Sequence, residues 1–279
     1  MSLVISCFAN SYGRFGTQGA IESVRAAGID YVELPIRTDG VKPFFGDVPM
    51  VTNASGLDDL KAVDAMLETH GVKVSSCNLT TGNPLERKNV EIIKRKLELA
   101  SHFGVAKCVG DAGKVEDDSQ LKTLYAHLGE IGDHAAKYDI TFCFETHPGI
   151  CQNHRGMIET MEALEHPHLR INFDTGNLFY YNDYMECEVA LAKVCHLVGH
   201  VHLKDCQGEK GAWYFPALGH GGAVDFVRVL ELMTTCGFTG PFSLEIEGIE
   251  GEGKLTLEQY QQRIVDSVKH LRDCGYYNF

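Results

Sequence analysis

Short apolar runs recur along this chain, and segments with helical hydrophobic period separate them. We count eight such pairs between residues 3 and 274. A repeated order of helix, glycine and short β-branched strand is typical of a parallel sheet. Eight strand–helix units match a (β/α)8 barrel, which typically has about 250 residues. The sequence therefore predicts an α/β fold of the TIM-barrel type. A doubly wound open sheet is the alternative, but no G-x-G-x-x-G motif follows the first run.

The hydrophobic period, and the glycine and proline residues between segments, indicate where the individual strands and helices lie. Strands are expected at residues 3–8, 30–35, 72–78, 105–109, 140–145, 169–174, 200–205 and 242–246. Helices are expected at residues 18–27, 57–70, 85–103, 117–138, about 154–165, about 184–195, 224–236 and 256–274. Two long loops, residues 37–55 and 204–222, lie between these elements. There is no composition break or linker, so we predict one domain over residues 1–279.

The last four predicted strands each carry a metal-ligating type of side chain near their carboxyl end. These residues are Glu145, Asp174, His202 and Glu245, at steps of 29, 28 and 43 positions. One strand plus its helix takes roughly 30 residues, so each step spans one unit, the third with a longer loop. The carboxyl ends of barrel strands share one face. We therefore expect these four side chains to meet there.

Three carboxylates and one imidazole suit a divalent metal ion. Oxygen ligands with one nitrogen favour Mn²⁺, with Mg²⁺, Co²⁺, Fe²⁺ or Zn²⁺ as alternatives. Three carboxylates placed together would repel one another without a cation. Each residue alone has a simpler structural explanation, such as Asp174 capping the next helix. All four at barrel-unit spacing instead predict one shared metal site.

Four further residues are candidates for substrate binding. His147 lies two positions after a predicted ligand, and Asn177 lies three after another. His220 lies in a glycine-rich turn, and Asn78 ends the third predicted strand. Loop packing would explain His147 equally well, and helix capping is the alternative for Asn177. The turn that holds His220 is expected to be a flexible rim, and Asn78 is the weakest candidate of the four. His200 shares a strand face with the predicted histidine ligand but lies one layer deeper, so we expect it to support a ligand or fill the core.

Composition limits the classes of binding partner and the cellular compartment that we expect. The net charge of −13 disfavours a nucleic-acid binder, which needs a basic surface. No apolar run reaches the roughly 18 residues of a membrane span. The first residues lack a basic region and a cleavage site, so we expect no signal peptide. The ten cysteines are scattered without a C-x-x-C motif. We therefore expect reduced core cysteines in a cytoplasmic protein.

Four segments carry a resemblance to a known family: FETHPG, NFDTGN, HVHLKD and FSLEIEG. Together they resemble the xylose-isomerase-like superfamily of TIM barrels. The likeness is to its sugar isomerase/epimerase branch, which includes ketose 3-epimerases and inosose isomerases and dehydratases. The resemblance implies that Glu145, Asp174, His202 and Glu245 bind one divalent metal ion, often manganese. It also implies that Glu145 and Glu245 act as acid and base on a bound sugar.

The sequence departs from the epimerases at three positions around the site. Cys151 stands near the place of a second glutamate, Asn177 replaces a histidine, and Gly208 lies near the place of an arginine. The residues that bind the metal ion in the epimerases are therefore retained, whereas residues at three other positions around the site differ.

These features together predict a metal-dependent isomerase or epimerase. We expect it to move a proton next to the carbonyl of a ketose or keto-cyclitol. The alternative is a dehydratase or β-elimination lyase that uses the same metal site. An endonuclease-like phosphodiesterase, which needs two or three metal ions, and a non-catalytic sugar-binding subunit are weaker alternatives. The expected partner is a small sugar or cyclitol rather than nucleic acid or a membrane. A homo-oligomer is compatible with the sequence.

Overall fold

A closed barrel of parallel strands forms the centre of the molecule. The computed structural model describes residues 3–277, and within them eight strands pair side by side around the barrel. In order they are β1 (Ile5–Phe8), β2 (Tyr31–Pro35), β3 (Lys73–Asn78), β4 (Lys107–Gly110), β5 (Thr141–Glu145), β6 (Leu169–Asp174), β7 (Val198–Leu203) and β9 (Phe242–Leu244). Parallel pairing of β9 with β1 closes the ring. The predicted barrel is confirmed, and the open sheet is excluded.

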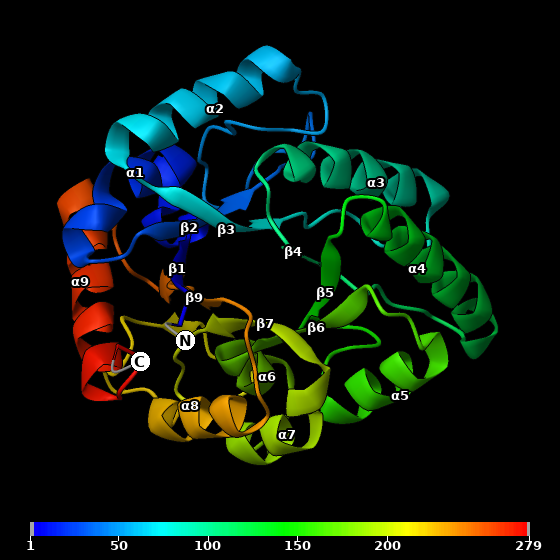
Figure 1. Ribbon diagram of the computed structural model, residues 1–279. Helices are drawn as coiled ribbons and strands as arrows, with labels where there is room; N and C mark the ends of the chain where they lie inside the picture. Colours follow the sequence, from blue (N-terminus) through cyan, green and yellow to red (C-terminus); the bar gives the residue numbers. More distant parts are fainter. Residues whose placement is uncertain (1–2, 278–279) are drawn as a thin grey trace.

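Helices surround the barrel as an outer layer (Figure 1). They are α1 (Gly16–Ser23), α2 (Leu57–His70), α3 (Arg87–His102), α4 (Leu121–Ala136), α5 (His154–Leu164), α7 (Cys187–Val194), α8 (Phe226–Thr235) and α9 (Leu257–Asp273). The short helix α6 (Thr175–Tyr181) lies inside this layer and contacts β7 and α7. Short 3-10 turns are η1 (Ala9–Phe15), η2 (Val24–Ala27), η3 (Asp118–Gln120) and η4 (Cys195–Leu197). Within residues 3–277, no helix is both long and apolar enough to cross a membrane.

Local sequence signals explain where these elements begin and end. The α2 helix stops at Gly71, whose φ of 63° is a left-handed conformation that glycine adopts without strain. The α9 helix begins with a capping box. In it the Thr256 hydroxyl accepts from the Gln259 N–H, and the Gln259 side chain accepts from the Thr256 N–H. Every residue of β7 is buried, as expected for a strand covered on both faces.

Two elements near the carboxyl ends of the strands were not predicted from the sequence. The helix α6 begins directly after β6, where we expected only a loop before a helix at residue 184. The loop of residues 204–222 contains β8 (Tyr214–Phe215), which pairs antiparallel with β10 (Gly248–Ile249). This pairing joins segments far apart in the sequence, so no local period reveals it.

A disulfide joins Cys195 and Cys236, which corrects the expectation that all ten cysteines are reduced. Their Cα atoms lie 6.1 Å apart, a spacing that suits a disulfide. The two residues are 41 positions apart and meet because α7 and α8 pack against each other. The other eight cysteines are free, and seven of these are buried, as predicted for core residues.

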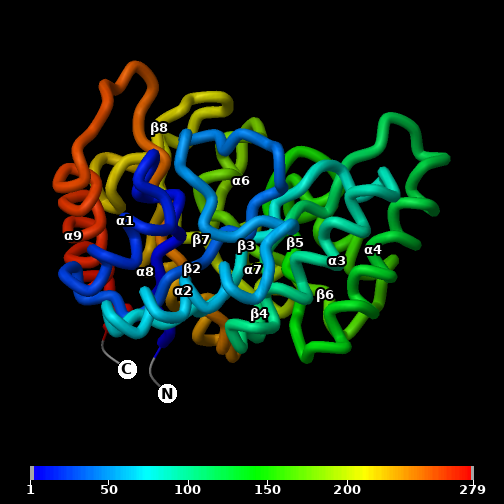
Figure 2. The backbone as a smooth tube through the Cα atoms, turned by 90° about the horizontal axis from the view of Figure 1, so that it is seen from above, coloured from blue at the N-terminus to red at the C-terminus, as the bar shows by residue number. Residues whose placement is uncertain are grey.

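The long loops gather on one side of the barrel. Figure 2 shows residues 37–55 and the segment that contains β8 on the side opposite the first and last described residues. This is the side at which the strands end. The candidate site therefore lies beneath two loops that the sequence singled out as long and irregular.

Candidate functional site

The four predicted metal ligands converge at the carboxyl ends of their strands. Glu145 ends β5, Asp174 ends β6, His202 lies one residue from the end of β7, and Glu245 follows β9. All four are buried. The Nδ1 atom of His202 lies 3.0 Å from Glu145 Oε2, 3.0 Å from Glu245 Oε2 and 3.8 Å from Asp174 Oδ2. These four side chains, which span 100 positions of the sequence, therefore meet at one point.

Two carboxylate oxygens at this point have no hydrogen-bond partner. They are Asp174 Oδ2 and Glu245 Oε2, and both are buried. A buried, unpaired carboxylate oxygen is costly, and a bound cation removes that cost. The donor set of three carboxylates and one imidazole suits a divalent ion. The residues present therefore fit a metal ion.

The charges around this point lead to the same conclusion. Burial raises the pKa of Asp174, and Glu245 raises it further, against the opposing effect of Lys204. The pKa of Glu245 is lowered because Lys204 and His202 outweigh its burial. The carboxylates therefore cannot all ionise together unless a further positive charge joins them.

Asp174 combines a structural and a ligand-like role. Its Oδ1 accepts hydrogen bonds from the N–H groups of Gly176 and Asn177 at 2.8 and 2.7 Å, which caps α6. Its Oδ2 is the unpaired oxygen described above. The capping explanation and the metal explanation are thus compatible, because each uses a different oxygen.

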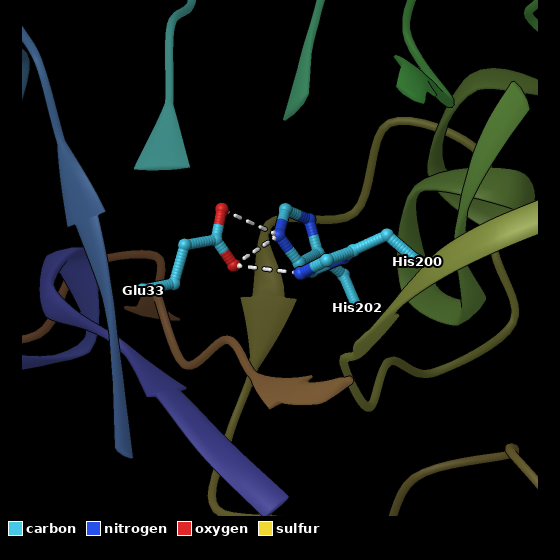
Figure 3. Close-up of side chains that lie close together, drawn as sticks. All are labelled: Glu33, His200 and His202. Atoms are coloured by element: carbon cyan, nitrogen blue, oxygen red, sulfur yellow. Dashed lines mark hydrogen bonds and ion pairs between the residues drawn. The ribbon is translucent and has the colours of Figure 1, made fainter. Parts of the chain in front are cut away.

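Glu33 of β2 holds the other side of the His202 ring, a contact that the sequence analysis missed (Figure 3). Its Oε2 lies 2.9 Å from His202 Nε2, and the Glu33 side chain is 0% exposed. Burial lowers the pKa of His202, but the charges of the neighbouring glutamates outweigh it and raise the pKa well above the ordinary value, so the ring is protonated when no cation is bound. With a cation bound, a neutral His202 that donates from Nε2 to Glu33 would present an unprotonated Nδ1 to the carboxylates. The signal in the sequence was a charged residue in the apolar strand YVELP.

His200 lies one layer deeper and organises a different ligand. Its Nδ1 lies 2.7 Å from Asn172 Oδ1, and its Nε2 lies 3.0 Å from Ser76 Oγ. Asn172 in turn donates to Glu145 Oε2 at 2.7 Å. Burial lowers the pKa of His200 to about 3, so the ring is neutral. A chain of hydrogen bonds therefore connects the barrel interior to one predicted ligand.

Glu33, His200 and His202 also lie close enough together to hold an ion. Their polar atoms, however, already pair with one another, with Ser76 and with Asn172. The unpaired oxygens lie on the opposite side of His202. Glu145, Asp174 and His202 likewise lie close enough together to hold an ion, and with Glu245 they form what we call the candidate metal-binding point.

A cavity of about 300 Å³ opens above this point. Its lining includes Glu145 and Glu245 together with three of the four predicted substrate-binding residues, His147, Asn177 and Asn78. His220 is not among the lining residues. Its side chain is 57% exposed and lies 4.0 Å from Asp266.

Three cationic side chains, Arg37, His147 and Lys204, line the cavity without belonging to the candidate metal-binding point. His147 Nδ1 lies 2.6 Å from Asp111 Oδ1. Burial lowers the pKa of His147, but the Asp111 charge outweighs it and raises the pKa to about 9. Lys204 is buried, bonds to Asn177 Oδ1 at 3.1 Å, and forms an ion pair with Glu247.

The pKa of Lys204 lies above its ordinary value because Glu245, Glu247 and Asp174 outweigh its burial. The sequence analysis did not assign a role to Lys204 or Glu247, since strand-end charges are usually solvated.

Comparison with known proteins identifies the family. The family of xylose isomerase-like TIM barrels matches residues 21–274. The chain belongs to this family.

Individual members of the xylose isomerase-like family resemble the chain to different extents. An inosose dehydratase of Halalkalibacterium halodurans is 29% identical over 147 residues, which span 47% of each sequence. The chain thus matches about half the length of this curated relative. A xylose isomerase-like TIM barrel protein from Mycobacterium smegmatis, in complex with magnesium, has a TM-score of 0.74 at 17% identity. That alignment covers 98% of this chain and 97% of the other.

An L-ribulose 3-epimerase superposes with a TM-score of 0.75 at 16% identity, over 98% of this chain and 94% of the other. At such identities the two superpositions show a shared xylose isomerase-like fold. The predicted family is confirmed, and its named relatives include an epimerase and a dehydratase.

Proposed function

We propose that this chain is a metal-dependent enzyme that moves a proton next to the carbonyl of a ketose or keto-cyclitol. The observation that carries this proposal is the convergence of three carboxylates and an imidazole, with two buried oxygens left unpaired. The inosose dehydratase relative and the epimerase fold support it. Isomerisation or epimerisation is the outcome we favour.

Glu145, Asp174, His202 and Glu245 would hold one divalent ion, with Mn²⁺ expected first and Mg²⁺, Co²⁺, Fe²⁺ or Zn²⁺ as alternatives. When bound, such an ion supplies Lewis-acid polarisation of a substrate carbonyl. Glu145, Asp174 and Glu245, at the carboxyl ends of β5, β6 and β9, would supply the oxygen ligands. The barrel mouth then gives access to a substrate from one side only.

Glu145 and Glu245 would carry the proton. They approach His202 Nδ1 from strands separated by β6 and β7, each at 3.0 Å. One carboxylate takes the proton as the C–H bond next to the carbonyl breaks. Return of a proton to the same carbon from the other face gives epimerisation. Return to the neighbouring carbon gives isomerisation.

Dehydration or β-elimination is the second candidate, and one observation favours it. His147 and Lys204 place protonated groups in the cavity that do not belong to the candidate metal-binding point. Either could give its proton to a departing hydroxyl as the C–O bond breaks, so that water leaves. The proton lost from carbon would still go to a glutamate. Asn177 and Asn78 would hold substrate hydroxyls in both reactions.

The expected setting is a cytoplasmic protein that acts on a small molecule, alone or as a homo-oligomer. A phosphodiesterase of this fold would need two or three metal ions and a basic groove. A sugar-binding subunit would bind metal and ligand without reaction. Elemental analysis of the loaded protein separates the first alternative, because we expect one ion per chain.

Solvent deuterium uptake tests the proposed reaction directly. We expect the Mn²⁺-loaded protein to introduce deuterium next to the carbonyl of at least one ketose or keto-cyclitol in a broad panel. H202A should abolish uptake, whereas E231Q, an exposed change on α8, should leave it unchanged. Absence of exchange across the panel with one ion bound per chain would favour the non-catalytic alternative.

A further inference from the structure

A continuous row of aromatic rings leads from the floor of the cavity to solvent. Lys204 Nζ lies 4.3 Å from the Phe215 ring, and Phe215 packs against Trp213 at 5.1 Å between ring centres. Trp213 packs against Phe44 at 5.6 Å. Phe45 and Tyr180 extend the row at its sides. We call these five aromatic residues the aromatic wall, and all five line the cavity.

Exposure rises along the aromatic wall. Phe215 is 1% exposed, whereas Phe44, at the far end, is 79% exposed. Single exposed hydrophobic residues are common on protein surfaces. Phe44 differs because its ring continues a row of rings that begins at the ionised floor. The apolar surface of the cavity therefore extends outward to the edge of the molecule.

The aromatic wall is held in place by contacts outside it. Arg37 bonds to Asn10 Oδ1 at 2.5 Å and to Asp47 Oδ2 at 3.1 Å, which fixes the loop that carries Phe44. Pairing of β8 with β10 fixes Trp213 and its neighbours. The carbonyl of Tyr180 accepts from the N–H of Gly211 at 2.9 Å. A surface held in this way before binding loses little freedom when a ligand covers it.

The floor of the cavity is polar and its outer end is aromatic, so a ligand that fills both ends needs a polar part and an apolar part. Glu145, Glu245 and Lys204 at the floor suit hydroxyl and carbonyl groups. A ligand confined to that floor would leave the outer rings, Phe44 and Trp213, without a partner. A flat ring attached to the polar part would cover them, because aromatic rings stack well on one another.

We propose that the cavity accepts an aryl glycoside whose sugar ring carries a keto group, with that ring at the floor and its aromatic aglycone against the aromatic wall. This rests on the function proposed above and adds the class of substrate. A second sugar ring fits less well, because its hydroxyls need polar partners. Three of the five wall residues, Phe44, Phe45 and Phe215, carry no polar side-chain group, so the aromatic wall offers hydroxyls only the side chains of Tyr180 and Trp213.

Trp213 makes the binding measurable without catalysis. It is the only tryptophan in the chain, so fluorescence that is excited selectively at tryptophan, and not at the 11 tyrosines, reports on the aromatic wall. Phenyl β-D-glucopyranoside lacks the carbonyl, so it serves as an unreactive analogue. With Mg²⁺ supplied, we expect it to change this fluorescence and to bind about tenfold more tightly than methyl β-D-glucopyranoside. F44A should remove most of that preference. V48A should keep it, because Val48 is 83% exposed on the same loop and does not line the cavity.

Three results would overturn this proposal. Equal affinities for the phenyl and methyl glucosides would show that the aromatic wall does not recognise the aglycone. Tighter binding of cellobiose than of the phenyl glucoside would assign the outer region to a second sugar. A change in sedimentation of F44A, with the ligand preference intact, would mean that another copy of the chain covers Phe44. Deuterium uptake is independent of all three, so failure of the reaction and failure of this subsite are distinguishable.

Discussion

Glu33 makes no contact with the cavity, yet it controls what His202 presents to it. The carboxylate and the imidazole are both buried, at 2.9 Å between Oε2 and Nε2. A histidine that donates from one ring nitrogen to a carboxylate is fixed in one tautomer and becomes a stronger ligand at the other nitrogen. Asn78 also donates to Glu33, at 3.3 Å, and keeps its carboxylate in place.

We expect E33Q to weaken Mn²⁺ binding by about 10- to 100-fold, because the neutral amide no longer favours the Nε2–H tautomer. Titration calorimetry measures the affinity, and ¹⁵N NMR of the Mg²⁺-loaded protein, in which the ring is neutral, reads the tautomer of His202. E22Q, on the surface of α1, is the matched control. Unchanged affinity and an unchanged tautomer in E33Q would contradict this role.

Asp174 serves both the fold and the candidate site, because it caps α6 and is also a predicted metal ligand. Its first turn takes its cap from Asp174 Oδ1, whereas Oδ2 faces the other carboxylates. Asparagine caps helices about as well as aspartate does. Substitutions at this position can therefore separate the two roles.

We expect D174N to lose metal binding but to keep the stability of the metal-free protein, since it retains a capping oxygen and removes a buried charge. D174A should lose metal binding and also about 0.5–2 kcal/mol of unfolding free energy. Thermal unfolding in chelator, together with calorimetric titration of Mn²⁺, distinguishes the two variants. Equal destabilisation of both would show that the cap contributes nothing.

Sequence patterns located the elements better than they located the contacts between them. The alternation of strands and helices predicted the barrel. The spacing of the four candidate ligands predicted that Glu145, Asp174, His202 and Glu245 lie at one face of it. Glu33 and Lys204 were not assigned because a single charge in a strand has many explanations. The disulfide and the β8–β10 pairing depend on segments that meet only after folding. His220 lies in the glycine-rich turn noted in the sequence, but its side chain is exposed to solvent.

Stability of the entire barrel depends in part on a buried lysine. Lys96 of α3 reaches the carbonyls of Leu79 and Thr80 and the hydroxyls of Thr38 and Thr81, at 2.9–3.3 Å. These neutral partners connect α3 to the end of β3 and to the loop of residues 37–55. Burial lowers the pKa of Lys96 from 10.5 to about 7.

This shift predicts how stability changes with pH. Between about pH 7 and 10.5 the unfolded chain keeps the Lys96 proton that the folded chain releases, so its contribution to the unfolding free energy rises with pH. We expect wild type to gain up to about 1.4 kcal/mol per pH unit relative to K96M. Urea unfolding at several pH values measures this difference. K88M, at an exposed position on the same helix, should show none, and a constant difference for K96M would contradict the shift.

The bridge between Cys195 and Cys236 lies where β7 and β9 begin, whereas the ionisable cluster lies where these strands finish. Reduction of the bridge would thus loosen the base of the barrel and leave the proposed catalytic residues in register. A change in the thiol balance around the protein would then alter its stability without altering the proposed site.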